Sequence, residues 1–528
     1  MLSRFAATAA LVLIALASPL PRANGAEHYK TIVLVIDGLR PDMLRPEIMP
    51  NLTRLKQDGV WCTNAHSVFP TVTRVNSASI SSGTVPSVHG IVSNTMWVEA
   101  VSPKPFDTAN YRNLVKLAEV SGGRTLPVKT LAEMLQLGGL TFVALSSGSS
   151  GSGYLLNPTV ADGTGILING GLEEGKRAAF PDSVNQEILK NFGIAKADSG
   201  LPSMLWTERV LRDYVIEVLQ PDVVIDWMTE PDGTQHKFGV GSPEAIAALK
   251  AVDEQVGLLV AKLKQNGSDR TTNIIVTADH GFAAEPDPVD LNGALKASGK
   301  ADDVIVASNG ASAFLYVKNH DSASIRQIVL QLQKTDGVDV LFTASSAPEK
   351  GTLRCETEAA KEQGWVPGTF ALEVIDQCSP SRGADVIVTF RWTSDKNEFG
   401  YPGIQGIASN DARRGVKGRS GHGGLNPWMI HTPMILAGPG FKKRTEVSAP
   451  VANFDIAPTI LTLEGLWPPE SMRGRALTEA FAKSPGASPQ TRVRTIRTEA
   501  GSFCATLQIS QVEKRTYIDH GQRCGIVK

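Results

Sequence analysis

Three short stretches carry acidic and imidazole side chains of the kinds that bind metal ions. "EPDGTQHKFG" holds Asp232 and His236, four residues apart, and "TADHG" holds Asp279 and His280 after an apolar run. "GRSGHGG" places His422 between glycines, which let a backbone approach an ion closely. Carboxylate oxygens and imidazole nitrogens in this mixture suit zinc or a similar divalent ion.

Asp37 joins these residues in "IDGLRPD", directly after the apolar run 31–36. The set then has three aspartates and three histidines, enough ligands for two ions. Each motif alone is weak evidence for a metal site. An aspartate after a strand is more often a helix cap, and a single histidine is more often a hydrogen-bonded polar residue. Together they predict a two-ion centre at one edge of a sheet.

The apolar runs beside these motifs predict the elements that position them. "KTIVLVIDGLRPDM" opens with a continuous apolar run, as a strand buried on both faces does. Similar runs recur in "LTFVALSS", "PDVVIDWM", "TNIIVTADHG" and "HTPMILAGPG", with helical patterns such as "TERVLRDYVIEVLQ" between them. The alternation predicts a doubly wound, mostly parallel α/β sheet that binds ligands at the carboxyl ends of its strands. Asp37, Asp226 and Asp279 are expected at or just past such ends.

The length of 528 residues and the breaks in this pattern predict several units. These are a signal peptide (1–26), an α/β core (27–283 and 412–485), a smaller inserted α+β lobe (284–411) and a hairpin-like extension (486–528). The biased segment "SSGSSGSG" (146–153) is predicted to be one flexible loop.

The first 26 residues have the pattern of a secretory signal, with Arg4, an apolar run over 5–17 and small residues at 23–26. The mature chain is expected to begin near Ala26 or Glu27 and to be periplasmic or secreted. No other stretch reaches about 18 uninterrupted apolar residues, so no membrane anchor is predicted. The net charge of −1 gives no positive excess for binding nucleic acid.

Five cysteines fit an oxidising compartment. The last four allow three connectivities, and proximity in the chain favours Cys355–Cys378 and Cys504–Cys524, with Cys62 free. None has the CxxC spacing of a thiolate metal site.

The motifs "IDGLRPD", "FPTVTRVNSASISSGTVPSVHGIVSN", "EPDGTQHKFG", "TADHGF" and "GHGG" resemble the type I phosphodiesterase/nucleotide pyrophosphatase family of the alkaline phosphatase superfamily. The resemblance covers nearly all of the chain after residue 26. It implies an alkaline-phosphatase-type sheet and a secreted, two-zinc hydrolase of a small-molecule phosphate ester, with a threonine nucleophile and a phosphoenzyme intermediate.

The resemblance also assigns site residues: Asp232, His236 and His422 to a first zinc ion, Asp37, Asp279 and His280 to a second, Thr73 as the nucleophile and a ligand of the second ion, and Asn94 to a phosphoryl oxygen. A threonine hydroxyl is a poor nucleophile near neutral pH, and an adjacent metal ion would activate it. A helix that starts near Val75 is expected to offer free backbone N–H groups to the phosphoryl oxygens. Thr71 is expected to be only a turn residue.

The substrate is less well defined by the sequence. The family's Phe-Pro-Asn-His after the nucleophile is replaced by Arg-Val-Asn-Ser (74–77), so a base-stacking ring is missing there, and Tyr154 or Trp97 are the candidate substitutes. The segment 145–158 lacks the Lys-x-Arg pair of related monoesterases, which favours a diester, although Arg74 is placed to bind a terminal oxygen.

Three alternatives stay open: a phosphomonoesterase, a sulfatase suggested by "CSPSRG" (378–383), and a binding protein without catalysis. The sulfatase is disfavoured because Thr73 occupies the nucleophile position and Cys378 lies in the inserted lobe. The sequence leaves the oligomeric state open.

Overall fold

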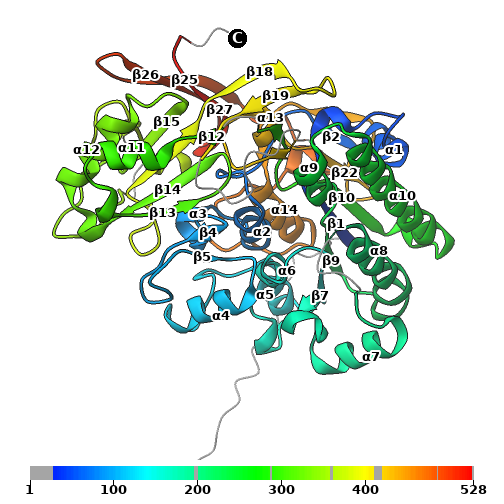
Figure 1. Cartoon of the computed structure of the whole chain (residues 1–528). Coiled ribbons are helices and arrows are strands. Elements are labelled where there is room, and N and C mark those ends of the chain that lie inside the picture. The colour runs from blue at the N-terminus through cyan, green and yellow to red at the C-terminus, as the bar shows by residue number, and fades with distance from the viewer. Residues whose placement is uncertain are drawn as a thin grey trace, which may run out of the picture.

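A nine-stranded sheet runs through the middle of the molecule (Figure 1). The computed structural model describes residues 28–195, 200–285, 288–356, 361–408, 419–484 and 486–525, so the predicted signal peptide lies outside the described residues. The strand order is β23 (Thr445–Val447), β2 (Val60–Cys62), β22 (Met434–Ala437), β10 (Thr272–Thr277), β1 (Lys30–Ile36), β9 (Val223–Met228), β6 (Phe142–Ser146), β7 (Ile166–Leu172) and β8 (Arg177–Phe180).

The central strands β10, β1, β9, β6 and β7 are parallel, which agrees with the predicted doubly wound sheet. The run "HTPMILAGPG" forms β22, which is antiparallel to β10. The chain enters β22 from the carboxyl edge of the sheet, after the His422 loop and the short helix α13 (Pro427–Ile430), and a parallel strand would have needed a longer crossover.

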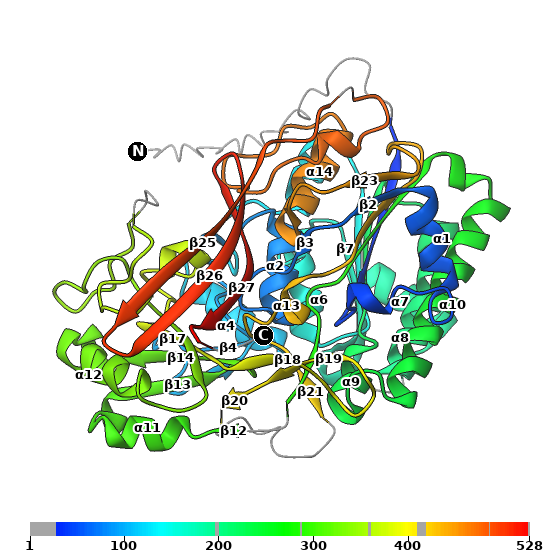
Figure 2. The same cartoon turned by 90° about the horizontal axis from the view of Figure 1, so that it is seen from above.

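Alternate residues of β1 pack on opposite faces of the sheet, which explains its continuous apolar run. Val33 and Val35 belong to the core beneath one layer of helices, and Ile32 and Leu34 to the core beneath the other. Figure 2 shows the two layers. The first contains α2 (Thr73–Ser82), α4 (Tyr111–Glu119), α5 (Leu131–Leu137), α6 (Ser150–Leu156) and α14 (Ile456–Leu463). The second contains α1 (Pro50–Asp58), α7 (Asp182–Phe192), α8 (Leu201–Val210) and α10 (Pro243–Gln265).

A second sheet and core lie to one side (Figure 1). This sheet has the order β13 (Val304–Ser308), β14 (Ser312–Val317), β17 (Val386–Phe390), β15 (Val338–Thr343) and β16 (Phe370–Ala371), with α11 (Leu291–Ala297) and α12 (Ser322–Leu332) beside it. The C-terminal residues form three antiparallel strands, β25 (Thr491–Ala500), β26 (Phe503–Val512) and β27 (Arg515–Arg523).

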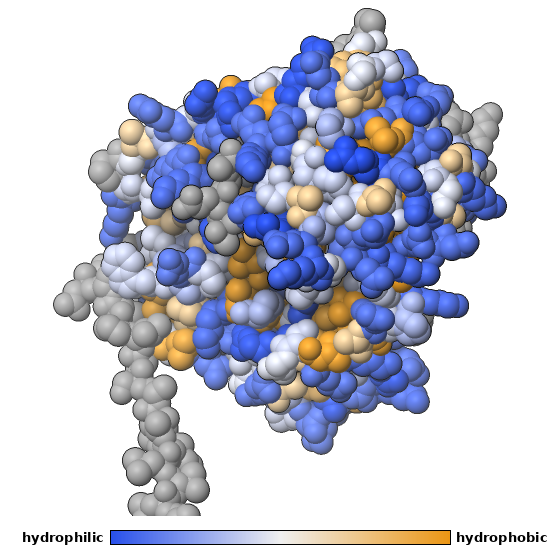
Figure 3. Space-filling view, turned by 90° about the vertical axis from the view of Figure 1, so that its left-hand side faces the viewer, coloured by the Kyte–Doolittle hydropathy of each residue, from blue (hydrophilic) through white to orange (hydrophobic). Residues whose placement is uncertain are grey.

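The exact boundaries of the predicted core, inserted lobe and C-terminal extension stay a prediction. Figure 3 shows the face on this side, which is mostly hydrophilic with scattered apolar residues.

The prediction of a flexible Gly/Ser loop at 146–153 is wrong. Residues 150–156 form α6, which is capped because the Ser149 hydroxyl accepts a hydrogen bond from Ser152 N–H at 3.2 Å. Gly153 packs closely here, since a Cβ added to it would lie 3.0 Å from the side-chain nitrogen of Asn169. The glycines therefore serve close packing rather than flexibility.

Asp226 also differs from the prediction, because it lies inside β9 and not at its end. Its register partners are Leu34 and Leu145, and burial raises the pKa of its carboxyl to about 7 beside the carboxyl of Glu208. It therefore takes no part in the site at the strand ends.

The predicted cysteine pairing is confirmed. Cys355 is bonded to Cys378 and Cys504 to Cys524, while Cys62 is free and buried. Among the described residues, no helix has the length and apolar character needed to cross a bilayer.

Candidate active site

Two neighbouring parallel strands and one helix position the three predicted aspartates. Asp37 follows β1 directly, and Asp279 comes two residues after β10, so both lie at the same edge of the sheet. Asp232 is the first residue of α9 (Asp232–Phe238), and His236 lies one turn later on the same face of that helix. The parallel pairing of β1 and β10 thus brings motifs about 240 residues apart to one place.

A short ladder brings the two remaining histidines together. β11 (Ala283–Ala284) pairs antiparallel with β21 (Ser420–Gly421), so the loops that carry His280 and His422 lie side by side. The two imidazole rings stack with their centroids 3.7 Å apart. Gly423 follows with φ +106, and a side chain there would collide with the carbonyl group of Asn309. Only glycine fits this turn.

All three histidines are oriented in the same way. Their Nδ1 atoms lie 3.0, 2.9 and 3.2 Å from backbone carbonyl oxygens, those of Ser420 for His236, Thr71 for His422 and Gly281 for His280. With Nδ1 donating to a carbonyl, each Nε2 carries a lone pair that faces into the site. The Nε2 atoms of His236 and His422 are only 3.1 Å apart. Two lone pairs so close repel each other unless a cation lies between them.

The aspartates present acceptors to the same space. One oxygen of Asp37 accepts from Trp227 Nε1 at 2.9 Å, and one oxygen of Asp279 accepts from Gly38 N–H at 3.0 Å. Within the described part of the chain, the second oxygen of each carboxylate is buried and accepts no hydrogen bond. These second oxygens lie 3.6 Å (Asp37) and 3.0 Å (Asp279) from His280 Nε2.

Burial raises the pKa of Asp37 well above its ordinary value, and the charges of Asp279 and Asp232 raise it further. The carboxylates of Asp37, Asp232 and Asp279 are thus crowded together, and a bound cation stabilises such an arrangement. Two overlapping groups could hold an ion, Asp232 with His236 and His422, and Asp232 with Asp37 and His280. Asp232 belongs to both groups, whereas the sequence assigned it to the first site only. The buried oxygen of Asp279 lies beside the second group and completes it. The residues therefore fit a pair of divalent ions.

Thr73 lies beside the second group. It is the first residue of α2, and its hydroxyl oxygen is 3.4 Å from His280 Nε2. The next N–H of the helix, that of Arg74, is not free as predicted, because it donates to Asn94 Oδ1 at 2.9 Å. With this oxygen engaged, the NH₂ group of Asn94 remains as a donor for a ligand. The Arg74 guanidinium lies 3.3 Å from Asp107 Oδ1.

Two residues that support the site were not recognised from the sequence. Thr71 does more than form a turn, since its hydroxyl donates to the carbonyl of Gly424 at 3.1 Å and accepts from Gly423 N–H at 3.0 Å. Its own carbonyl orients His422. Phe282 is fully buried, and its ring lies edge-on to His236 with the centroids 4.9 Å apart. The motif "TADHGF" ends on this residue, but nothing in the sequence shows which rings it contacts.

Replacing Thr71 with valine is expected to lower the affinity of the group Asp232, His236 and His422 for a divalent ion by about 10–100-fold, because valine keeps the shape of threonine but cannot hold the His422 loop. Zinc titration of the metal-free variant measures this change, and excess zinc should restore turnover. Thr84→Val is the matched control, since Thr84 is equally buried and makes no side-chain hydrogen bond among the described residues. Equal zinc affinity in the two variants would contradict the role given to Thr71.

Comparison with known proteins identifies the family. Residues 31–349, more than half of the chain, match the model of the type I phosphodiesterase/nucleotide pyrophosphatase family. The chain belongs to this family. It is 28% identical over 268 residues to a venom phosphodiesterase of Macrovipera lebetinus, a match that covers 49% of this chain and 26% of that protein. It is 29% identical over 267 residues to human ectonucleotide pyrophosphatase/phosphodiesterase family member 1, covering 49% and 24%. The matches thus span about a quarter of the length of these relatives.

Solved structures of members of this family share the fold. Murine ectonucleotide pyrophosphatase/phosphodiesterase 5 aligns with a TM-score of 0.57 at 16% identity, over 86% of this chain and 100% of that chain. A second structure of the murine protein, an inactive threonine-to-alanine variant in complex with AMP, aligns with a TM-score of 0.57 at 15% identity over the same shares. At this level of identity the likeness concerns the fold, and it confirms the predicted fold class.

Tyr154 and Trp97, the two candidates for stacking on a nucleotide base, each contact another aromatic ring. Tyr154 is buried in the helical layer, with its ring 6.0 Å from that of Tyr111. Trp97 packs edge-on against Tyr316 at 5.6 Å. Tyr154 is therefore not an exposed platform for a nucleotide base, whereas Trp97 is half-buried.

Proposed function

We propose that this chain is a two-zinc phosphodiesterase that uses Thr73 as its nucleophile. The observation that carries the proposal is the convergence of three histidine Nε2 atoms and three carboxylates around the Thr73 hydroxyl, which lies 3.4 Å from His280 Nε2. Asp232, His236 and His422 would hold one ion, and Asp37, Asp279 and His280 the other, with Asp232 near both. The names of the family and of its relatives support the same reaction class.

The reaction proceeds in two steps, the transfer of the phosphoryl group to Thr73 and the hydrolysis of the resulting intermediate. The Thr73 oxygen forms a bond to phosphorus while the bond between phosphorus and the leaving oxygen breaks. The threonine hydroxyl gives its proton to water, and the leaving alcohol takes up a proton from water. Water then attacks the phosphothreonine diester, which restores Thr73 and releases a phosphate monoester. Zinc, when bound, lowers the pKa of an adjacent hydroxyl and balances negative charge on the phosphoryl oxygens. The side-chain NH₂ group of Asn94 donates a hydrogen bond to one of these oxygens.

A diester fits the charges near Thr73 better than a monoester does. A monoester dianion usually requires an added cationic clamp. The segment 145–158 has no lysine or arginine, and the guanidinium of Arg74 is paired with Asp107 at 3.3 Å. The positive charge of Arg74 is thus partly balanced before any substrate binds.

Turnover of a nitrophenyl diester is expected to exceed that of the matched nitrophenyl monoester by about 100-fold in kcat/KM, which corresponds to about 2.7 kcal/mol. Initial rates on the two substrates, at the same pH and zinc concentration, measure the ratio. Equal or faster hydrolysis of the monoester would assign the chain to the phosphomonoesterases instead. Arg74→Ala is the companion variant, and a selective loss of the monoester rate would identify Arg74 as the clamp.

We also expect export from the cytoplasm. Two disulfides are typical of chains that fold in an oxidising compartment. The relatives named above include a venom enzyme and an ectoenzyme, which fits the same location. The signal peptide at 1–26 remains a prediction.

A further inference from the structure

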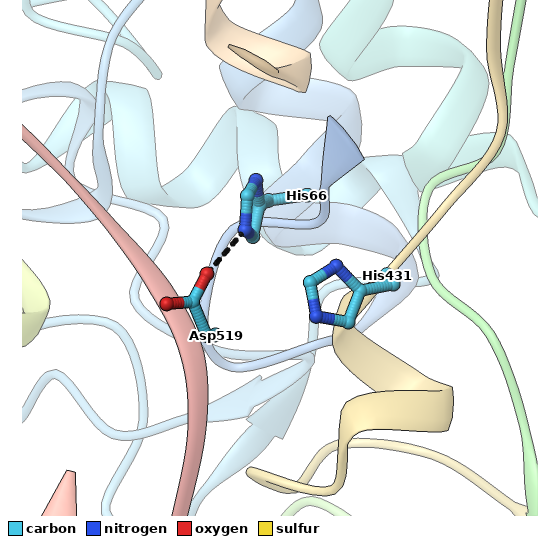
Figure 4. Close-up of side chains that lie close together, drawn as sticks. All are labelled: His66, His431 and Asp519. Carbon is cyan, nitrogen blue, oxygen red and sulfur yellow. Dashed lines mark hydrogen bonds and ion pairs between the residues drawn. The ribbon is translucent and has the colours of Figure 1, made fainter. Parts of the chain in front are cut away.

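A second cluster of histidine and carboxylate side chains lies outside the active-site motifs. It joins His66 of β3 (Ala65–His66), His431 directly after α13, and Asp519 of β27. One ligand atom from each residue lies within 4.8 Å of the others. Figure 4 shows the three side chains turned toward a common space, from three segments that are far apart in the sequence. None of the three has a role in the reaction proposed above.

The backbone fixes the two rings next to each other. His66 and His431 face each other in an antiparallel bridge, and Thr432 N–H donates to the carbonyl of Ala65 at 3.1 Å. The ring centroids are 4.8 Å apart. The rings are therefore held in place by the strands, before any ligand binds.

Both ring nitrogens of His66 face hydrogen-bond acceptors. Its Nδ1 lies 3.0 Å from the carbonyl oxygen of Val451, and its Nε2 lies 2.9 Å from Asp519 Oδ1. Both neighbours are acceptors, and a neutral imidazole donates only one proton, so the second contact needs an additional proton or a metal ion. A backbone carbonyl on one nitrogen and a ligand position on the other is the usual arrangement of a metal-binding histidine.

The other two side chains are also held by their neighbours. The His431 ring bonds the backbone of Ala65 and still offers a ligand atom within 4.8 Å of those of His66 and Asp519. The hydroxyl of Ser510 lies 3.1 and 3.0 Å from the two carboxylate oxygens and orients them.

We propose that His66, His431 and Asp519 bind a third divalent ion of zinc type, with a structural role. Two imidazoles and one carboxylate with water in the fourth position are a zinc ligand set also found in catalytic sites. We assign this ion a structural role because its ligands come from three separate segments of the chain. The ion would join β27 of the C-terminal sheet to the two chain segments that lead into the active site. His66 precedes Thr73 by seven residues, and His431 follows His422 by nine.

The test measures bound metal in the full chain without using turnover. The double variant Asp232→Asn, Asp279→Asn replaces one carboxylate ligand of each proposed active-site ion, which should empty both sites, and should still bind one zinc ion per chain after gel filtration. Adding His431→Gln to it should reduce the content to none, and Asp519→Asn should do the same if His431→Gln does not fold. His320→Gln is the matched control, because His320 lies 2.7 Å from the Asp385 carboxylate in a part-buried pair that belongs to no metal-ligating group among the described residues.

A double variant that is folded by circular dichroism but binds no zinc would overturn the proposal and leave His66 and Asp519 as a buried ion pair. Equal loss of the ion in the His320→Gln control would also overturn it. The unaltered protein should contain three ions, and His431→Gln alone should contain two while it still hydrolyses the diester. Failure of the proposed phosphodiesterase activity would not change these metal contents, so the two proposals are tested separately.

Discussion

Thr73→Ala is expected to lower kcat/KM for a nitrophenyl phosphodiester by about 10³-fold or more, because alanine removes the attacking oxygen and nothing beside it replaces that atom. Among the described residues, the side chain of Thr73 has one hydrogen-bond contact, with His280 Nε2 at 3.4 Å, so the loss should leave the fold and the bound metal unchanged. Steady-state kinetics combined with elemental analysis of the same sample would separate lost chemistry from lost metal.

Two variants control this experiment. Thr73→Ser keeps the hydroxyl and should recover most of the rate. Ser82→Ala removes a hydroxyl from the other end of α2, where its one hydrogen bond within the described part of the chain goes to the carbonyl of Ala78, and should have no effect. Near-normal turnover by Thr73→Ala would exclude Thr73 as the nucleophile.

Asp279→Asn is expected to reduce kcat/KM by at least about 10³-fold and to leave one ion fewer per chain than in the unaltered protein. Asparagine can still accept the hydrogen bond from Gly38, but its NH₂ group would replace the buried oxygen that lies 3.0 Å from His280 Nε2. The site then loses a negative ligand without a change of shape. Chelation of the unaltered protein should abolish activity, and added zinc should restore it.

Asp213→Asn is the matched control for this variant. Asp213 is exposed on a helical segment away from the site, so the same chemical change should leave both metal content and rate as they were. An Asp279→Asn protein with its full metal content, or with normal turnover, would contradict the assignment of Asp279 to the second ion.

The central sheet and the six candidate ligands were accessible from the sequence because their signals are local. A buried parallel strand is a continuous apolar run, and Asp37 and Asp279 directly follow such runs. Asp232 and His236 are spaced by one helical turn. Proximity along the chain was also sufficient to pair the four cysteines.

The remaining features depend on contacts between distant segments, which leave no pattern in the sequence. His66, His431 and Asp519 belong to three separate segments, and no motif links them. Thr71 acts through the loop after His422, which is about 350 residues away. The Gly/Ser segment 146–153 looked flexible because composition alone does not show that Gly153 packs against Asn169 and Gly151 against the backbone of Thr108.

Covalent trapping of the nucleophile tests the central claim most directly. The unaltered enzyme would be mixed with a nitrophenyl phosphodiester and quenched in acid within the first turnover, and its peptides would be analysed by mass spectrometry. We expect a phosphoryl ester on the peptide that contains Thr73, assigned to Thr73 by fragmentation and missing from Thr73→Ala. A burst of nitrophenol with no modified Thr73, or with the phosphoryl group on another residue, would contradict it.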